Sequence, residues 1–398
     1  SLVFTVTDVN GKSVNFPSEE NSSIKIAYDS DVPEISVLKL GDVTYTSGCF
    51  AKEKFKISGE IKDSSGTVEI YEKAGGTETK VSEITDCSSK KTWVTEEITN
   101  NSGDITKTFV AKDKYGREKT LEINYKVDNV PPVFVSDYIS ITGETVGGSK
   151  TYVLGGTGDV YNQDNVWFTG SSFTLKGGDG TNSKIPVTEK NNFEIKLYKG
   201  SYSEENLIST IQPSGNNNFS GTVDVGGENA STIILVAVDE AKNISNPLSV
   251  QVNVDRVAPL ITNKEIYLEN PPAQALPEKG YVNKDSVFVK FEATDSVSKV
   301  KSVEIYKTAA LKERIGLKEF SPAVEVASGV IEIDISRFDS KEYDLYIKVT
   351  DVAGNSSYTD LPNFIFDKNP PVVTYSRPAA NSDVNKLITI EGLIDDLN

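Results

Sequence analysis

The chain of 398 residues contains no histidine and no methionine, and it has only two cysteines. Without imidazole, a Ser-His-Asp or Cys-His nucleophile cannot form, and neither can a zinc site that relies on histidine. Adjacent acids such as Asp395 and Asp396 remain, but neighbouring side chains on a strand point to opposite faces. We therefore expect no catalytic site and no enzyme activity.

The sequence also lacks long apolar runs and an excess of positive charge. No hydrophobic stretch approaches the roughly 20 residues that a membrane helix needs, so we expect no membrane insertion. The formal net charge of -17 opposes binding to nucleic acid and favours solubility and cations. The chain begins without methionine and inside a strand pattern, so we expect it to be part of a longer protein.

What the sequence does contain is a repeated strand pattern. Apolar residues alternate with polar ones in "LSVQVNVD" from Leu248 and "LYIKVTD" from Leu345, which is typical of half-buried strands. Short turns with glycine or asparagine follow an aspartate at the end of such strands. These turn aspartates are Asp8, Asp113, Asp239 and Asp351. Their spacing is that of a small β domain of about 100 residues, so the pattern predicts a string of antiparallel sandwiches.

Prolines mark the ends of the repeats, because proline cannot continue a central strand. They follow strands that finish in aspartate and include Pro33, Pro131, Pro132, Pro259, Pro370 and Pro371. We predict three complete modules with a fragment at each end: 1–32, 33–130, 131–258, 259–369 and 370–398. The glycine-rich stretch 143–165 in the middle module is interpreted as an inserted loop or hairpin.

The text "VTDVAGN", a further strand and then "DKNPPVV", together residues 349–373, resembles the bacterial immunoglobulin-like repeats of large cell-surface proteins and adhesins. Tyr343 stands where such sandwiches have a tyrosine corner. The junction "KVDNVPPVF", residues 126–134, is similar to the junctions of cadherins. The resemblance implies an all-β fold of tandem immunoglobulin-like antiparallel β-sandwiches forming an extended rod. It also implies a location outside a bacterial cell or on its surface.

The two cysteines, Cys49 and Cys87, both lie in the first complete module. An exported protein meets an oxidising compartment, so we predict a disulfide between them. The alternative is a pair of buried, reduced thiols.

An aspartate is present in three places at each junction between modules. In an immunoglobulin-like sandwich the incoming linker, the loop after the second strand and the loop between the last two strands lie at the same end. Converging carboxylates repel one another, whereas Ca²⁺ accepts about six to eight oxygen ligands. We therefore predict calcium at three groups: Asp31, with Asp29 nearby, Asp63 and Asp113; Asp128, Asp179 and Asp239; Asp255, Asp295 and Asp351. The alternative is that each aspartate only closes its own turn through nearby backbone amides.

Aromatic residues in and beside the glycine-rich stretch offer a surface for stacking on a sugar or entering a protein interface. The candidates for ligand contact are Tyr152, Tyr161 and Trp167. The alternative is that Trp167 and Phe168 begin a strand and that at least one of the two rings is part of the core.

Three classes of function fit these features. The chain is a structural stalk of a secreted or cell-surface adhesin-like protein, a ligand-binding immunoglobulin-like module, or a non-catalytic accessory region of a large secreted polysaccharide-acting enzyme. Tandem modules, proline linkers and the lack of catalytic residues favour the stalk. Its expected partners are a protein or glycan on another surface and the neighbouring modules of the same chain.

Short proline linkers between sandwiches predict an elongated particle in solution. A compact globule of about 400 residues has a radius of gyration of roughly 21 Å. We expect small-angle X-ray scattering to give a clearly larger value, because stiff linkers prevent the modules from folding back on one another. A radius near the compact value would contradict the prediction.

Overall fold

The computed structural model describes the chain in several ranges: 4–16, 29–155, 162, 166–181, 183–271, 274–377, 379, 381, 383 and 387–396. Two compact units are distinguished. One comprises Ser1–Val133, Glu189–Glu194 and Ala237–Ser245, and the other comprises Phe134–Thr188, Ile195–Val236 and Asn246–Asn398. No helix in the described ranges has the length and apolarity needed to cross a membrane.

The first sandwich has a four-stranded and a five-stranded sheet, in the orders β10-β7-β3-β4 and β5-β13-β12-β8-β9. Its strands are β3 (Glu34–Leu40), β4 (Val43–Thr44), β5 (Cys49–Ala51), β7 (Ile57–Lys62), β8 (Thr67–Ala74), β9 (Thr77–Thr85), β10 (Lys91–Val94), β12 (Gly103–Asp113) and β13 (Glu118–Val127). A small pair joins β6 (Lys54–Phe55) and β11 (Ile98–Thr99). The core between the sheets contains Trp93, Phe109 and Tyr125, all at most 1% exposed.

The second sandwich repeats this plan with sheets β16-β15-β18-β22 and β17-β24-β23-β20-β21. Its strands are β15 (Ile139–Thr145), β16 (Gly148–Val153), β17 (Trp167–Phe168), β18 (Ser172–Gly177), β20 (Phe193–Lys199), β21 (Leu207–Ile211), β22 (Phe219–Asp224), β23 (Asn229–Asp239) and β24 (Leu248–Val254). Shorter elements are β14 (Val133–Phe134), β19 (Val187–Thr188) and the 3-10 turns η1 (Ser136–Tyr138), η2 (Glu204–Asn206) and η3 (Gly215–Asn217).

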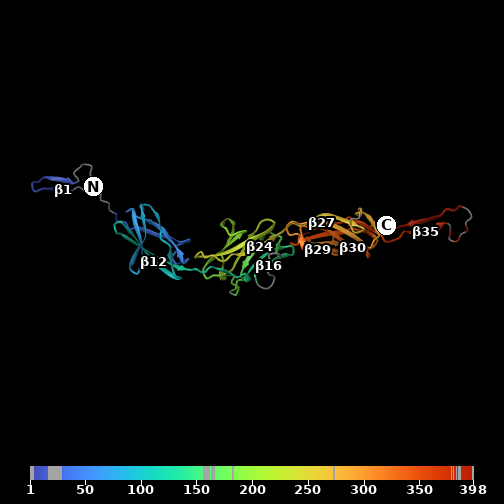
Figure 1. Ribbon diagram of the computed structural model, residues 1–398, viewed down its shortest axis with the longest axis horizontal. Helices are drawn as coiled ribbons and strands as arrows, with labels where there is room; N and C mark the ends of the chain where they lie inside the picture. Colours follow the sequence, from blue (N-terminus) through green and yellow to red (C-terminus); the bar gives the residue numbers. More distant parts are fainter. Residues whose placement is uncertain are drawn as a thin grey trace. The chain divides into compact units, whose positions relative to one another are not determined.

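The third sandwich is built from the sheets β25-β27-β30, β26-β34-β31 and β29-β28-β32-β33; β27, β29 and β30 are labelled in Figure 1. Its strands are β25 (Leu260–Tyr267), β26 (Gly280–Val282), β27 (Ser286–Thr294), β28 (Val300–Tyr306), β29 (Arg314–Val324), β30 (Val326–Asp334), β31 (Lys341–Tyr343), β32 (Tyr346–Asp351), β33 (Ser356–Asp360) and β34 (Phe364–Phe366). Strand β32 has the burial alternation that "LYIKVTD" predicts, with Ile347 and Val349 fully buried.

Each end of the chain has a separate two-stranded antiparallel hairpin. The first joins β1 (Phe4–Thr7) to β2 (Ser13–Phe16), and the last joins β35 (Val372–Arg377) to β36 (Glu391–Asp395). Every described residue of these strands is exposed.

The all-β, immunoglobulin-like architecture expected from the sequence is confirmed. The tyrosine corner is also present, because the buried Tyr343 accepts a hydrogen bond on its hydroxyl from the backbone amide of Asp339, at 3.0 Å. One feature differs from a purely antiparallel sandwich: β5 with β13, β17 with β24 and β26 with β34 are parallel pairs. In each pair, a short strand from the first part of the sandwich lies beside the last strand of that sandwich.

The glycine-rich stretch begins inside a strand, and its described part is a hairpin, which is one of the two forms that the sequence predicts. Gly143 belongs to β15 and pairs with Phe173 of β18. A Cβ on Gly143 would lie 2.7 Å from the ring of Phe168, so a larger side chain would disturb the core. The described part of 143–165 forms the β15-β16 hairpin, and 156–161 with 163–165 lie outside the described residues.

The predicted disulfide is wrong, because the structure has Cys49 and Cys87 as free thiols. Cys49 pairs with Tyr125 near one end of the five-stranded sheet. Cys87 accepts a hydrogen bond on its backbone oxygen from the amide of Asp63, at the other end. Along β12 these ends are separated by about 25 Å, whereas a disulfide needs Cα atoms within roughly 7 Å of each other.

Thiol labelling tests this correction. Protein kept without reductant and then denatured should give two labelled cysteines per chain. In the native state Cys87 should react slowly, because its side chain is fully buried and burial and Asp63 raise the pKa of its thiol. Failure to label either cysteine in denaturant would restore the disulfide.

Candidate metal centre

The junction aspartates use one carboxylate oxygen to close local turns. Asp351 accepts the backbone amides of Gly354 and Asn355 on its Oδ1, at 2.6 and 2.8 Å. Asp255, which follows β24, accepts the amide of Val257 on Oδ1 at 2.9 Å. The local-turn alternative is thus seen in the structure. It uses mainly one oxygen of each side chain, and the second oxygen can face other partners.

Asp255, Asp295 and Asp351 come together in the second unit, and we call them the Asp255 cluster. Asp255 belongs to the linker, Asp295 follows β27 and Asp351 ends β32. One carboxylate oxygen from each lies within 4.8 Å of the others, and the residues are 0%, 6% and 0% exposed. Among the residues that the structure describes, no lysine or arginine forms an ion pair with any of the three.

In the described ranges, the groups that contact the second oxygens of this cluster are neutral. The side-chain amide of Asn355 donates to Oδ2 of Asp351 and to the backbone oxygen of Asp255, both at 3.1 Å. The backbone amide of the buried Ser298 donates to Oδ2 of Asp255 at 3.2 Å. These contacts bind the linker to both loops but leave its negative charge uncompensated.

The electrostatic consequence appears at Asp351. Burial is the main cause that raises the pKa of this carboxyl group to about 6; the charges of Asp255 and Asp295 act in the same direction, and the hydrogen bonds from Asn355 and Gly354 oppose them. In the absence of a nearby cation, the carboxyl group of Asp351 therefore keeps its proton to a higher pH than an ordinary aspartate does.

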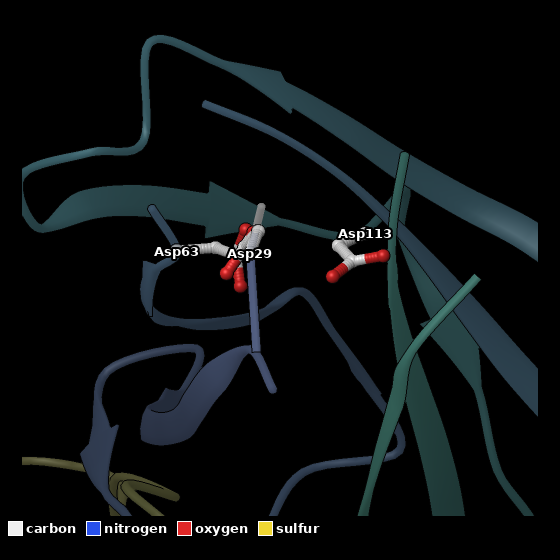
Figure 2. Close-up of side chains that lie close together, drawn as sticks. All are labelled: Asp29, Asp63 and Asp113. Carbon is white, nitrogen blue, oxygen red and sulfur yellow. The ribbon is translucent and has the colours of Figure 1, made fainter. Parts of the chain in front are cut away.

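The first unit contains a second group, the Asp29 cluster, formed by Asp29, Asp63 and Asp113 (Figure 2). Here a cation is already present: Nη2 of Arg117 lies 2.7 Å from Oδ2 of both Asp29 and Asp113. The hydroxyl of Ser64 donates to Asp29 at 2.7 Å. The pKa of Asp29 is lowered, mainly by Ser64 and also by the amide of Asp31 and by Arg117.

The prediction for Asp31 is corrected by this geometry. Asp31 is exposed, and its backbone amide donates to Oδ1 of Asp29 at 3.1 Å. Asp29 takes the predicted place because the chain turns at this Asx motif, which directs the earlier of the two aspartates to Asp63 and Asp113.

The middle junction has two carboxylates joined by amides. The side chain of Asn191 donates to Oδ2 of Asp128 at 2.5 Å. Asn243 donates from its side-chain nitrogen to the backbone oxygen of Asp128 and to Oδ2 of Asp239, both at 2.9 Å. Burial raises the pKa of Asp239, and Asp128 adds to this effect.

Asp179, predicted to join this junction, has other partners. Its carboxylate accepts hydrogen bonds from the hydroxyl and backbone amide of Thr181, at 2.6 and 2.9 Å, and lies 3.4 Å from Nζ of Lys184. These contacts lower its pKa, the Thr181 hydroxyl most strongly. Asp179 does not reach the junction because the connection between β18 and β20 is long. A later residue of this connection, Asn191, contacts Asp128 instead.

The donor groups can be tested for their fit to Ca²⁺. The Asp255 cluster offers three buried carboxylates from three segments and no basic partner in the described residues, which fits a hard divalent cation. The Asp29 cluster does not fit in its present form, since a guanidinium contacts two of its carboxylates. The middle junction is intermediate, because its oxygens are largely used by amides.

A simple spacing identifies the linker aspartates. Asp29 stands four residues before Pro33, and Asp255 stands four residues before Pro259. Asp128 has the same spacing from Pro132. This rule selects Asp29 over Asp31 from the sequence alone.

A second spacing identifies the residues that sequence reasoning missed. The fourth residue after the turn aspartate always closes the turn, because its backbone amide donates to Oδ1 of that aspartate. In chain order these residues are Lys12, Arg117, Asn243 and Asn355. Arg117, Asn243 and Asn355 each contact the linker aspartate of their own junction.

The aromatic residues proposed for ligand contact lie mainly in strands. Trp167 and Phe168 form β17, and Phe168 is fully buried, as the alternative in the sequence analysis states. Tyr152 on β16 packs edge-on against Phe168, with ring centroids 6.1 Å apart. Tyr161 lies outside the described residues.

No family model and no curated protein matches the sequence. Among solved structures, the chain is similar to the fibronectin(III)-like modules of Clostridium thermocellum CbhA, with 13% identity, 56% of this chain and 94% of that chain covered, and a TM-score of 0.34. A tetra-tandem repeat in the extending region of a large adhesion protein is 14% identical, with 88% and 78% covered and a TM-score of 0.28.

The sialic acid binding region of a Streptococcus sanguinis SK1 adhesin is 13% identical, with 87% of this chain and 81% of that chain covered and a TM-score of 0.26. These neighbours are immunoglobulin-like β-sandwich repeats. At such identities the likeness concerns the fold alone, which the sheets of this chain establish independently.

The raised pKa of Asp351 predicts the pH dependence of stability in metal-free protein. The ordinary pKa is 3.8 and the folded value is about 6, so the folded state binds this proton more tightly than the unfolded state. The resulting stabilisation is complete below about pH 4 and is lost as the pH rises through 6. The difference between the two pKa values corresponds to about 3 kcal/mol.

Scanning calorimetry in chelator at several pH values between 4 and 7 measures this effect. Asp351→Asn should remove this part of the pH dependence, while Asp179→Asn, which changes an aspartate held by Thr181 and Lys184, should retain it. Equal pH dependence in wild type and Asp351→Asn would contradict the assignment.

Proposed function

We propose that the chain is a structural stalk segment of a secreted or cell-surface adhesin-like protein, stiffened by Ca²⁺ at the Asp255 cluster. The observation that supports this role is the burial of three carboxylates, one from a linker and two from loops of the following sandwich, without a basic partner in the described residues. Such a group is costly unless a cation neutralises it.

The residues of the chain supply the mechanism of stiffening. Asp255 is fixed to the two loops by the amides of Ser298 and Asn355. Asp295 is held on its own turn by the backbone amides of Val297 and Lys299, at 3.0 and 2.8 Å. A bound Ca²⁺ would add positive charge and shared oxygen coordination at this point. The linker then has one orientation on the sandwich that follows it.

This role places the chain outside a cell or on its surface, where free Ca²⁺ reaches millimolar concentrations suited to extracellular modules. The segment itself performs no catalysis and contacts its neighbouring modules. The ligand of the complete protein is a protein or a glycan on another surface. The exposed, acidic surface of the sandwiches, with a net charge of -17 for the chain, keeps such a stalk soluble.

Calorimetric titration of chelator-stripped protein with Ca²⁺ tests the proposal. Wild type should bind Ca²⁺ with a measurable heat, and Ca²⁺ at one hundred times its Kd should raise the free energy of unfolding by about 2.7 kcal/mol. Asp255→Asn combined with Asp351→Asn should bind one ion fewer, because two of three charged ligands are lost.

Asp179→Asn is the matched control, since it removes the same charge from an aspartate outside the cluster. It should bind Ca²⁺ as wild type does. The calcium role is wrong if wild type gives no heat and no stabilisation at millimolar Ca²⁺, or if the double variant binds as many ions as wild type.

A further inference from the structure

Arg117 occupies the position in the Asp29 cluster that a metal ion would need. Its Nη2 atom lies 2.7 Å from Oδ2 of Asp29 and 2.7 Å from Oδ2 of Asp113. A Ca²⁺ ion would bind the same oxygens at about 2.3 to 2.6 Å. The two cations therefore compete for one place between these carboxylates.

The ion pairs of Arg117 are partly shielded from water. The side chains of Arg117, Asp29 and Asp113 are 22%, 8% and 0% exposed. The guanidinium carbon also lies 5.3 Å from the ring centre of Tyr115, on the same turn. Burial disfavours the charged guanidinium, yet Asp29 and Asp113 raise the pKa of Arg117 above its ordinary value. Such an ion pair is screened by water much less than a surface pair.

The third carboxylate of the cluster, that of Asp63, has one oxygen without a hydrogen bond in the described ranges. Asp63 is 3% exposed, and its Oδ1 accepts the amide of Ser65 at 2.8 Å. Its buried Oδ2 has no hydrogen-bond partner among the described residues, while Oδ2 of Asp29 and of Asp113 has the ion-pair contact with Arg117 in place of a hydrogen bond. With Arg117 in place, only the Asp63 oxygen has no cationic partner in the part of the chain that the structure describes, and one oxygen is too little for a divalent ion; without Arg117, the Oδ2 atoms of all three carboxylates would be available.

The same backbone turn presents a different side chain in the Asp255 cluster. The amide of Asp113 donates to the backbone oxygen of Arg117 at 3.0 Å, and the amide of Asp351 donates to that of Asn355 at 3.1 Å. The amides of Arg117 and Asn355 donate back to Oδ1 of their aspartates, at 3.0 and 2.8 Å. Arg117 and Asn355 therefore occupy equivalent positions of the turn, but the side chain of Arg117 is cationic and that of Asn355 is neutral.

We propose that, at the two clusters of three carboxylates, the residue four positions after the turn aspartate selects the cation. Arg117 is the resident cation of the Asp29 cluster, which consequently takes no metal, while Asn355 leaves the Asp255 cluster open to a divalent ion. The statement on Asn355 rests on the proposed function, whereas the statement on Arg117 rests on the contacts of Arg117 alone. Junctions of one stalk thus divide into permanently closed and calcium-dependent ones.

Exchange of the two side chains in the full chain tests the inference. Arg117→Asn should bind one Ca²⁺ more than wild type in calorimetric titration, and Asn355→Arg should bind one fewer. In chelator, Arg117→Asn should lower the melting temperature of one transition, and Ca²⁺ should restore it. Asn355→Arg should melt higher than wild type in chelator, because the new guanidinium neutralises the Asp255 cluster.

Two control variants separate charge at this position from charge elsewhere. Arg117→Lys retains a cation, so it should bind no additional Ca²⁺ and should stay folded in chelator even if Arg117→Asn does not. Arg256→Asn removes an arginine that pairs with Glu228 on the surface, at 2.8 Å, and should leave the number of bound ions unchanged.

The outcomes distinguish this inference from the proposed function. If wild type binds no Ca²⁺, the calcium role fails, and the melting of Arg117→Asn in chelator then decides whether Arg117 is the resident cation. An unchanged transition in chelator together with no additional ion overturns the inference. Loss of a bound ion in Asp63→Asn also overturns it, because that result would place a metal in the cluster with Arg117 present.

Discussion

Burial of a linker aspartate against the loops of the next sandwich is the constraint on which the junctions depend. A carboxylate removed from water is costly unless hydrogen bonds and an opposite charge compensate it. Asp255 is fully buried and Asp29 nearly so, and both accept backbone amides on one oxygen. The backbone amides fix the course of the chain at the first carboxylate oxygen. The negative charge of the carboxylate needs a further compensating group at the second oxygen.

The three junctions meet this requirement with different chemistry on one backbone plan. Arg117 places a guanidinium between two carboxylates, and asparagine amides connect Asp128 and Asp239 at the middle junction. The Asp255 cluster has three acids whose partners in the described part of the chain are neutral donors. The pKa directions follow the chemistry: that of Asp29 is lowered and that of Asp351 is raised. A single side chain changes the charge balance without altering the turn that carries it.

The sequence predicted the sandwiches well because alternation in strands such as β32 and the prolines after them are local signals. It also placed Asp63, Asp113, Asp255, Asp295 and Asp351 correctly at their clusters, since loop position follows from strand order. It failed where the outcome depends on contacts between distant segments. Asn191 replaces Asp179 because of loop length, and Cys49 and Cys87 lie at opposite ends of a sheet. The role of Arg117 was missed because its partner Asp29 is far away in sequence.

The most direct test of these junctions is a crystal structure of the chain grown with millimolar Ca²⁺, with anomalous scattering used to locate the ions. The account predicts an ion among Asp255, Asp295 and Asp351, with oxygen ligands at about 2.3 to 2.6 Å. It also predicts the guanidinium of Arg117, and no ion, between Asp29 and Asp113. An Asp255 cluster without an ion, or an ion that has displaced Arg117, would contradict it.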